Sequence, residues 1–329
     1  FVASNHSATE IQAVMVLSQM CRLKGVIARR REAAEYLSKR FAEVEGIVTP
    51  PLDTDEIKST HHLYLLQIDP DKLKGDIQDL KDINRLPFTT ADDLRSGYPF
   101  PLLSVPHEKV VRIHASSGTT GKKKVLCYTQ NDVDDWKNFF ARCYEMSGCS
   151  DEDRVQICVG YGLWTAGAGF QLACEKFGAM AIPVGPGNID LQCQLLVDLQ
   201  STVLMATSSM ALLMAEEINR RGLLDQCNLK KITIGSERCS KAMRSRIKKL
   251  LQLDDIFEIT GMTELYGPGM GVECSHHTGI HYWADGYILE IIDPDTLKPV
   301  PEGEIGEMVV TTLKKEAAPL IRYRTRDLT

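Results

Sequence analysis

The stretch TVLMATSSMALLMAEEINRRGLLDQCNLKKITIGS, residues 202–236, places a helix-like segment between two apolar runs. The runs at 202–208 and 231–236 have the length and composition of buried strands. The segment between them, 208–222, predicts a helix and ends on a glycine, as helices often do. A strand, a helix and a second strand in this order predict a parallel pair joined by a crossover helix.

The same alternation extends in both directions from this stretch. A helix is predicted over 131–146, where Thr129 and Asp132 form a capping box and apolar residues share one face. Further strand-like runs lie at 110–115, 155–160, 179–185 and 256–261. These elements predict an α/β fold, a mostly parallel sheet covered by helices, with ligands at the carboxyl ends of its strands.

The order of predicted helices and strands divides the chain into three parts. Residues 1–80 contain a long helix over 7–44, which Ser7 and Glu10 begin as a capping box, followed by a strand within 61–70. Residues 81–284 carry the α/β core. Residues 285–329 are short strands joined by Pro, Gly and Asp turns, and we expect them to form a smaller antiparallel or β-barrel-like subdomain.

Composition narrows the class of protein. The 329 residues carry a net charge of -6, so no broad basic field favours nucleic acid or a membrane surface as partner. Ten cysteines are scattered without a CxxC pair, which predicts free thiols in a reducing compartment. No apolar run is long enough to span a bilayer, and the first residues do not resemble a signal peptide. We expect a soluble, cytoplasmic protein.

Residues 114–129, HASSGTTGKKKVLCYT, concentrate small, hydroxyl-bearing and basic residues between two apolar runs. Glycines let the backbone curl so that several N–H groups face one anion, and lysines add compact positive charge. The spacing is not that of a Walker A loop, and a flexible hairpin loop is the plain alternative. The candidate phosphate-binding residues are Ser117, Gly118, Thr119, Thr120, Gly121, Lys122 and Lys124.

Eight segments in order, over about residues 82–329, resemble the adenylate-forming superfamily, in particular the phenylacetate–CoA ligase family. They are LPFTTADDLRSGYPF, KVVRIHASSGTTGKKKV, VGYGLWTAGAGF, IGSERCS, EITGMTELYGPG, HYWADGYILEIIDP, EGEIGEMVVTT and PLIRYRTRDLT. The resemblance implies the large N-terminal domain of such a ligase. It also implies ATP, Mg²⁺ and coenzyme A, a small aryl carboxylic acid as substrate, and a possible homodimer.

Residue roles follow from the same resemblance. The phosphate loop and Lys124 would hold the β- and γ-phosphates of ATP, Thr263 would donate to the α-phosphate, and Glu264 would bind Mg²⁺. Asp327 would accept the two ribose hydroxyls; by itself it would read as a surface ion pair. The adenine side would be formed by Gly235, Ser236, Glu237, Thr260, Gly261 and Met262.

Two further groups of side chains are candidates. Tyr161, Gly162 and Trp164 follow a predicted strand and would form an apolar slot for an aryl acid, although Trp164 could equally be core. A possible zinc site, with a polar turn as the default, comprises Cys274, His276, His277 and His281.

The sequence departs from the family's pattern in several places. Lys123 stands where proline is usual in the loop, and Arg238 replaces another proline. Thr260 stands where an aromatic residue often stacks on adenine. The chain stops at Thr329, before the small C-terminal domain that carries the family's adenylating lysine. We therefore expect the chain as given to adenylate slowly and to make little thioester.

Residues 1–80 resemble the C-terminal part of DegT-like sugar aminotransferases, which use pyridoxal phosphate. The large domain that carries that family's Schiff-base lysine has no counterpart here, so pyridoxal phosphate is not expected. Two other functions stay open for the whole chain. One is an adenylating relative with another acceptor, such as a deazaflavin cofactor, and the other is an inactive nucleotide-binding fusion product.

Overall fold

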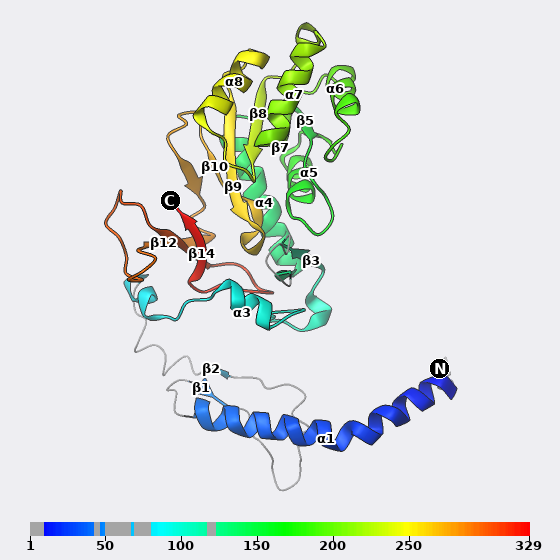
Figure 1. Ribbon diagram of the computed structural model, residues 1–329, viewed down its shortest axis with the longest axis vertical. Coiled ribbons are helices and arrows are strands. Elements are labelled where there is room, and N and C mark those ends of the chain that lie inside the picture. Colours follow the sequence, from blue (N-terminus) through cyan, green and yellow to red (C-terminus); the bar gives the residue numbers. More distant parts are fainter. Residues whose placement is uncertain (1–9, 43–46, 50–66, 69–79, 117–122) are drawn as a thin grey trace. The chain divides into compact units, whose positions relative to one another are not determined.

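The computed structural model describes residues 10–42, 47–49, 67–68, 80–116 and 123–329 (Figure 1). The chain forms two compact units, residues 1–86 and 87–329. The first contains helix α1 (Glu10–Phe41), which confirms the predicted helix. It also contains strands β1 (Ile47–Val48) and β2 (Gln67–Ile68), which pair antiparallel, and the 3-10 helix η1 (Leu80–Arg85). Ser7, the predicted start of the first helix, and most of the predicted strand at 61–70 lie outside the described residues.

The second unit is built on a seven-stranded sheet of order β11-β10-β9-β8-β7-β5-β6. Five neighbouring strands, β9, β8, β7, β5 and β6, run parallel, and β10 and β11 are antiparallel at one edge. The sheet is therefore mostly parallel, as predicted. Its strands are β5 (Arg154–Ile157), β6 (Met180–Ile182), β7 (Val203–Thr207), β8 (Lys231–Gly235), β9 (Ile256–Met262), β10 (Gly267–Glu273) and β11 (Ile280–Tyr282).

Alternating side chains of the buried strands pack against helices on both faces of this sheet (Figure 1). In β7, Val203 and Met205 pack in one apolar cluster with α4 and α5, whereas Leu204 and Ala206 pack in another with α6, α7 and α8. The helices are α4 (Gln130–Met146), α5 (Ala166–Phe177), α6 (Ile189–Asp198), α7 (Ser208–Arg220) and α8 (Lys241–Leu251). The capping box predicted for α4 is formed, since Thr129 Oγ1 accepts from the Asp132 backbone N–H and Asp132 accepts from that of Thr129.

Smaller elements complete the unit. Strands β3 (Arg112–Ala115) and β4 (Val125–Tyr128) form an antiparallel hairpin, and helix α3 (Ala91–Ser96) precedes it. Strands β12 (Tyr287–Ile292), β13 (Glu307–Thr312) and β14 (Tyr323–Leu328) form an antiparallel sheet in that order. The antiparallel arrangement predicted for residues 285–329 is confirmed by this sheet, and the barrel-like alternative stays a prediction. Short 3-10 helices are η2 (His107–Lys109), η3 (Leu224–Gln226) and η4 (Thr263–Leu265).

Within the described part of the chain, no helix has the length and apolar character needed to cross a membrane. The nine cysteines whose side chains the structure describes are all free thiols, as the sequence predicted, and five of them are buried.

Candidate functional site

The carboxyl ends of the parallel strands bring together most of the predicted site residues. The segment that carries Tyr161 and Trp164 follows β5, Ser236 follows β8, and Thr263 follows β9. Because these strands are parallel neighbours, or one strand apart, their carboxyl ends lie along the same edge of the sheet.

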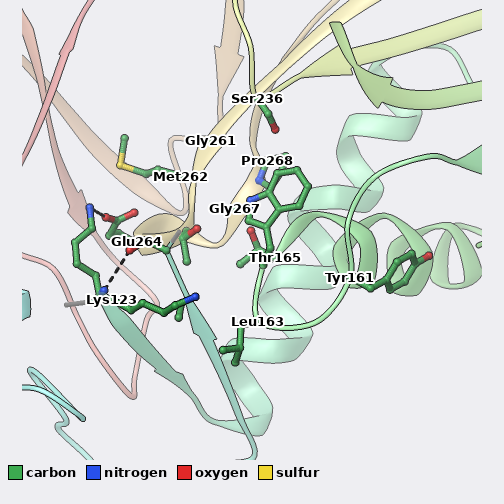
Figure 2. A pocket seen from close by; sticks show the side chains of 15 residues that line it. Lys123, Tyr161, Leu163, Thr165, Ser236, Gly261, Met262, Glu264, Gly267 and Pro268 are labelled. Carbon is green, nitrogen blue, oxygen red and sulfur yellow. Dashed lines mark hydrogen bonds and ion pairs between the residues drawn. The ribbon is translucent and has the colours of Figure 1, made fainter. Parts of the chain in front are cut away.

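A cavity of about 680 Å³ opens at this edge (Figure 2). Both flanks of the phosphate loop reach it, Ser116 from one side and Lys123 and Lys124 from the other, and Glu264 lines it as well. The predicted residues between these flanks, 117–122, lie outside the described residues. The other lining residues include Tyr161, Leu163, Trp164, Thr165, Ser236, Gly261, Met262, Thr263, Gly267 and Pro268.

Glu264 is the most constrained charged group in this cavity. Its side chain is only 5% exposed and forms an ion pair with Lys124, which is 19% exposed. Tyr323 Oη donates to the same carboxylate oxygen, Oε1, over 3.2 Å. The flank of the phosphate loop and the turn after β9 are thus joined through two opposite charges in a partly desolvated site, where such charges interact strongly.

Lys315 contacts the turn after β9 from the protein interior, and the sequence did not indicate this role. Its ammonium is buried 4.3 Å from the ring centre of Tyr128 and 4.7 Å from that of Tyr266. It donates to the backbone carbonyl of Glu264 over 3.1 Å, while Tyr128 Oη donates to that of Thr263 over 3.4 Å. Burial lowers the pKa of Lys315 to about 8, although negative charge nearby opposes that shift.

A second cavity, of about 330 Å³, shares Ser236 and Gly261 with the first. It brings together residues from β8, β9 and β14 that the sequence assigned to the nucleoside, namely Gly235, Ser236, Glu237, Thr260, Gly261 and Asp327. Arg238, one of the departures from the family pattern, lines it too. Asp327 keeps contact with solvent, yet partial burial and the nearby Glu264 carboxylate raise its pKa.

Besides lining the small cavity, Glu237 forms hydrogen bonds with α7 that the sequence did not indicate. Its carboxylate accepts from the backbone N–H of Ser209 over 2.9 Å, and its backbone carbonyl accepts from Ser208 Oγ over 3.0 Å. Both serines belong to the first turn of α7, where free N–H groups favour a negative charge. Glu237 therefore fixes the loop after β8 to this helix.

The segment after β5 separates the large cavity from an apolar one. Trp164 lines both, and the apolar cavity, of about 490 Å³, is otherwise formed by Cys158, Val159, Gly160, Pro186, Thr207, Ser209, Met210 and Leu213. Tyr161 lines the large cavity, and 37% of its surface is exposed. Gly162 turns the segment with a φ of +90° and lines neither cavity.

Comparison with known proteins agrees with this geometry. The AMP-binding enzyme family model matches residues 5–313. This chain belongs to the AMP-binding enzyme family. Its match begins at residue 5 and so runs through most of the segment in which we found a resemblance to aminotransferases; that resemblance stays a prediction.

Relatives of this AMP-binding enzyme include phenylacetate-coenzyme A ligases. The one from Escherichia coli K12 is 44% identical over 257 residues, which are 77% of this chain and 59% of that protein. The one from Thermus thermophilus is 40% identical over 264 residues, 80% of this chain and 58% of that protein. The chain therefore spans less than two thirds of the length of these curated relatives.

A solved structure supports the fold. An open conformation of 2-hydroxyisobutyryl-CoA ligase, in complex with 2-HIB-AMP and CoA, superposes with a TM-score of 0.72 at 23% identity. The match covers 78% of this chain and 61% of that one. The adenylate-forming fold that the sequence predicted is confirmed.

Among the described residues, no three histidine, cysteine or acidic side chains are placed to hold a metal ion, so the structure does not form the possible zinc site and agrees with the polar turn given as the default. The candidate ligands turn to different partners. His277 Nδ1 lies 3.3 Å from Glu273 Oε2, whereas His281 Nε2 lies 3.2 Å from Cys274 Sγ. Separate pairs of this kind cannot supply the four ligands of a closed zinc site.

His114 anchors the segment after β5 and gives a pH dependence of stability. It is 2% exposed, its Nδ1 donates to the Leu163 carbonyl over 3.1 Å, and burial lowers its pKa from 6.5 to about 4. Between pH 6.5 and about 4, the folded protein therefore keeps His114 neutral, whereas the unfolded chain protonates it. Its contribution to the unfolding free energy is full above pH 6.5 and falls as the pH drops toward 4, by up to about 3 kcal/mol.

A His114→Leu variant tests this. We expect the wild type to lose stability more steeply than the variant between pH 6.5 and 4, as measured by urea unfolding at several pH values. Parallel losses in the two proteins would show that His114 does not titrate in this way.

Proposed function

We propose that this chain is the nucleotide-binding part of an AMP-forming acid–CoA ligase of the phenylacetate type. The observation that carries the proposal is the large cavity, in which both flanks of the phosphate loop meet the Glu264 carboxylate. It adjoins a cavity of nucleoside size on one side and an apolar cavity behind Trp164 on another. The identity of 44% to a phenylacetate-coenzyme A ligase supports an aryl acid as substrate.

The proposed reaction has two steps. A carboxylate oxygen of the acid attacks the α-phosphorus of ATP, the bond to the β-phosphate bridge breaks, and pyrophosphate leaves. The thiol sulfur of coenzyme A then attacks the acyl carbon, AMP leaves with the bonding electrons, and the thiol proton passes to solvent. Both steps expel a phosphate anion, so fixed positive charge at the cavity lowers their barriers.

This chain's own residues supply that charge. Lys124 is held at the cavity by its ion pair with Glu264, and Lys123 lines the cavity beside it. In this proposal Lys124 neutralises the departing pyrophosphate, and Thr263 donates its hydroxyl to the α-phosphate. Asp327 accepts the ribose hydroxyls in the small cavity, where its partial burial strengthens a hydrogen bond to the sugar.

The residues present fit a magnesium ion that arrives with the nucleotide. A buried carboxylate at the wall of a polar cavity is one hard oxygen ligand, and Mg²⁺ commonly combines one or two carboxylates with water and substrate phosphates. Glu264 would hold the ion, which supplies neutralisation of the phosphate charge when bound. The chain needs no preformed cage of ligands for this role.

Binding of an acyl-adenylate mimic tests the proposal. Phenylacetyl-sulfamoyl-adenosine should bind at least about 100-fold more tightly than AMP, since it fills the nucleoside cavity and the acid slot together. Calorimetry of phenylacetyl, indoleacetyl and benzoyl mimics would rank the acids. Equal affinity for all mimics and for adenosine sulfamate would refute the acid site and favour an adenylating relative with another acceptor, such as a deazaflavin. Absence of nucleotide binding would refute the whole assignment.

Trp164 should set the size of the acid. Its indole is the wall between the large cavity and the apolar cavity, so Trp164→Ala joins the two spaces. We expect the affinity for the indoleacetyl mimic, relative to the phenylacetyl one, to rise about tenfold, a typical scale for apolar pocket discrimination. AMP affinity should not change. An equal loss for both mimics would show that Trp164 is only a core residue.

As part of the same proposal, we predict that the protein forms a homodimer and that it acts in the cytoplasm. Both properties agree with a soluble ligase of small acids.

A further inference from the structure

The antiparallel edge of the large sheet places three residues in one row. In its register, Thr260 of β9 lies opposite Gly271 of β10, and Gly271 lies opposite Tyr282 of β11. Residues directly opposite each other in a sheet point to the same face. Tyr282 and Thr260 are therefore on one face, with only a glycine between them.

The tyrosine ring uses the space that the glycine leaves. A Cβ atom on Gly271 would lie 3.1 Å from Tyr282 Cδ1, closer than an ordinary contact. The same Cβ atom would lie 2.7 Å from the His281 carbonyl oxygen and 2.8 Å from Ile280 Cγ2, so the Tyr282 ring and the Ile280 side chain both lie against the bare backbone of β10. Burial raises the pKa of the Tyr282 hydroxyl, and the nearby Asp327 carboxylate raises it further. A hydrogen bond with the Thr260 side chain acts in the opposite direction.

The same face borders the nucleoside-sized cavity. Thr260, Asp327 and Ile280 line that cavity, and Ile280 lies two residues before Tyr282 in β11, so their side chains share a face. Tyr282 is half-buried and packs against the main apolar cluster, which holds the ring in place. An ordered aromatic side chain therefore stands beside the cavity, next to the position where threonine replaces the usual aromatic residue.

We propose that Tyr282 provides the aromatic surface for the adenine base, in the place that Thr260 leaves vacant. The inference rests on the proposed function, because it needs a nucleotide in the small cavity. A base offers a flat π-face, and stacking on an aromatic side chain is tolerant of base identity. Tyr282 thus contributes affinity for purine nucleotides in general, while the choice among bases is left to polar groups of the cavity.

The experiment compares AMP with a probe that has no base. Affinities of wild-type protein, Tyr282→Leu and Tyr282→Phe for AMP and for inorganic tripolyphosphate are measured by calorimetry. Leucine keeps an apolar side chain without a π-face, and phenylalanine keeps the ring without the hydroxyl. Thermal unfolding of each variant shows that it is folded at the temperature of the measurement.

We expect Tyr282→Leu to weaken AMP binding about tenfold, the scale of one lost stacking contact, and to leave tripolyphosphate binding within about twofold. Tyr282→Phe should bind AMP within about threefold of the wild type. Adding Thr260→Tyr to Tyr282→Leu should restore most of the lost AMP affinity. These results together support the inference.

Other outcomes overturn it, and they separate it from the proposed function. If the wild type binds AMP and Tyr282→Leu binds it equally well, Tyr282 is not the stacking surface and the proposed function stands. An equal loss of AMP and tripolyphosphate binding would show general damage to the site, which also contradicts a base-specific role. If the wild type binds no AMP, both proposals fail.

Discussion

A Gly261→Ala variant should lose nucleotide binding and about 3 kcal/mol or more of its unfolding free energy. A Cβ atom at this position would lie 1.8 Å from the Gly267 carbonyl oxygen and 2.9 Å from Pro268 Cα. Both are backbone atoms, so no side-chain rotation can relieve the overlap, and the strands β9 and β10 must separate where they form the cavity wall.

Gly279 offers a matched control for this substitution. Its φ of +153° is close to the +157° of Gly261, but no heavy atom lies within 4 Å of its Cβ position. Gly279→Ala should therefore cost only about 1 kcal/mol, the effect of the unusual φ alone. Urea unfolding of both variants gives the comparison. Similar losses in the two would mean that the close approach of β9 and β10 is not what requires glycine.

The second large effect is expected for Glu264→Gln. The amide keeps the shape of the side chain but removes the charge that pairs with Lys124 and that would hold magnesium. We expect the gain in ATP affinity on adding Mg²⁺, measured by calorimetry with and without the ion, to fall about 100-fold. AMP binding without Mg²⁺ should stay within about threefold, because Asp327 and the loop after β8 are unchanged.

Glu304→Gln is the control for a general charge effect. Glu304 is exposed and lies in the turn before β13, and it lines neither the large nor the small cavity. Its substitution should leave the magnesium dependence as in the wild type. A Glu264→Gln variant whose ATP affinity still rises normally with Mg²⁺ would remove Glu264 from the metal's surroundings.

Local sequence patterns predicted the central fold well, for physical reasons. The apolar runs at 202–208 and 231–236 became β7 and β8, since parallel strands covered on both faces must be apolar throughout. Most of the described site residues assigned by resemblance lie at two adjoining cavities, because the carboxyl ends of β5, β8 and β9 lie along one edge of the sheet. Here short-range pattern and topology agree.

Features that depend on distant packing were not predictable in this way. Lys315 lies in the polar run LKKEAAP and reads as a surface lysine, yet Tyr128 of β4 and Tyr266 after η4 enclose it. The four candidate zinc ligands are close in sequence, but His277 turns to Glu273 and His281 to Cys274. Where a side chain points depends on partners that sequence spacing does not name.

A crystal structure of this chain with a non-hydrolysable ATP analogue and Mg²⁺ would show whether one nucleotide bridges the two cavities. We predict its base and ribose beside Thr260 and Asp327, and its phosphates between Lys124 and Glu264 with the metal at the Glu264 carboxylate. A nucleotide bound elsewhere, or phosphates that reach Lys124 while the ribose lies away from Asp327, would contradict it.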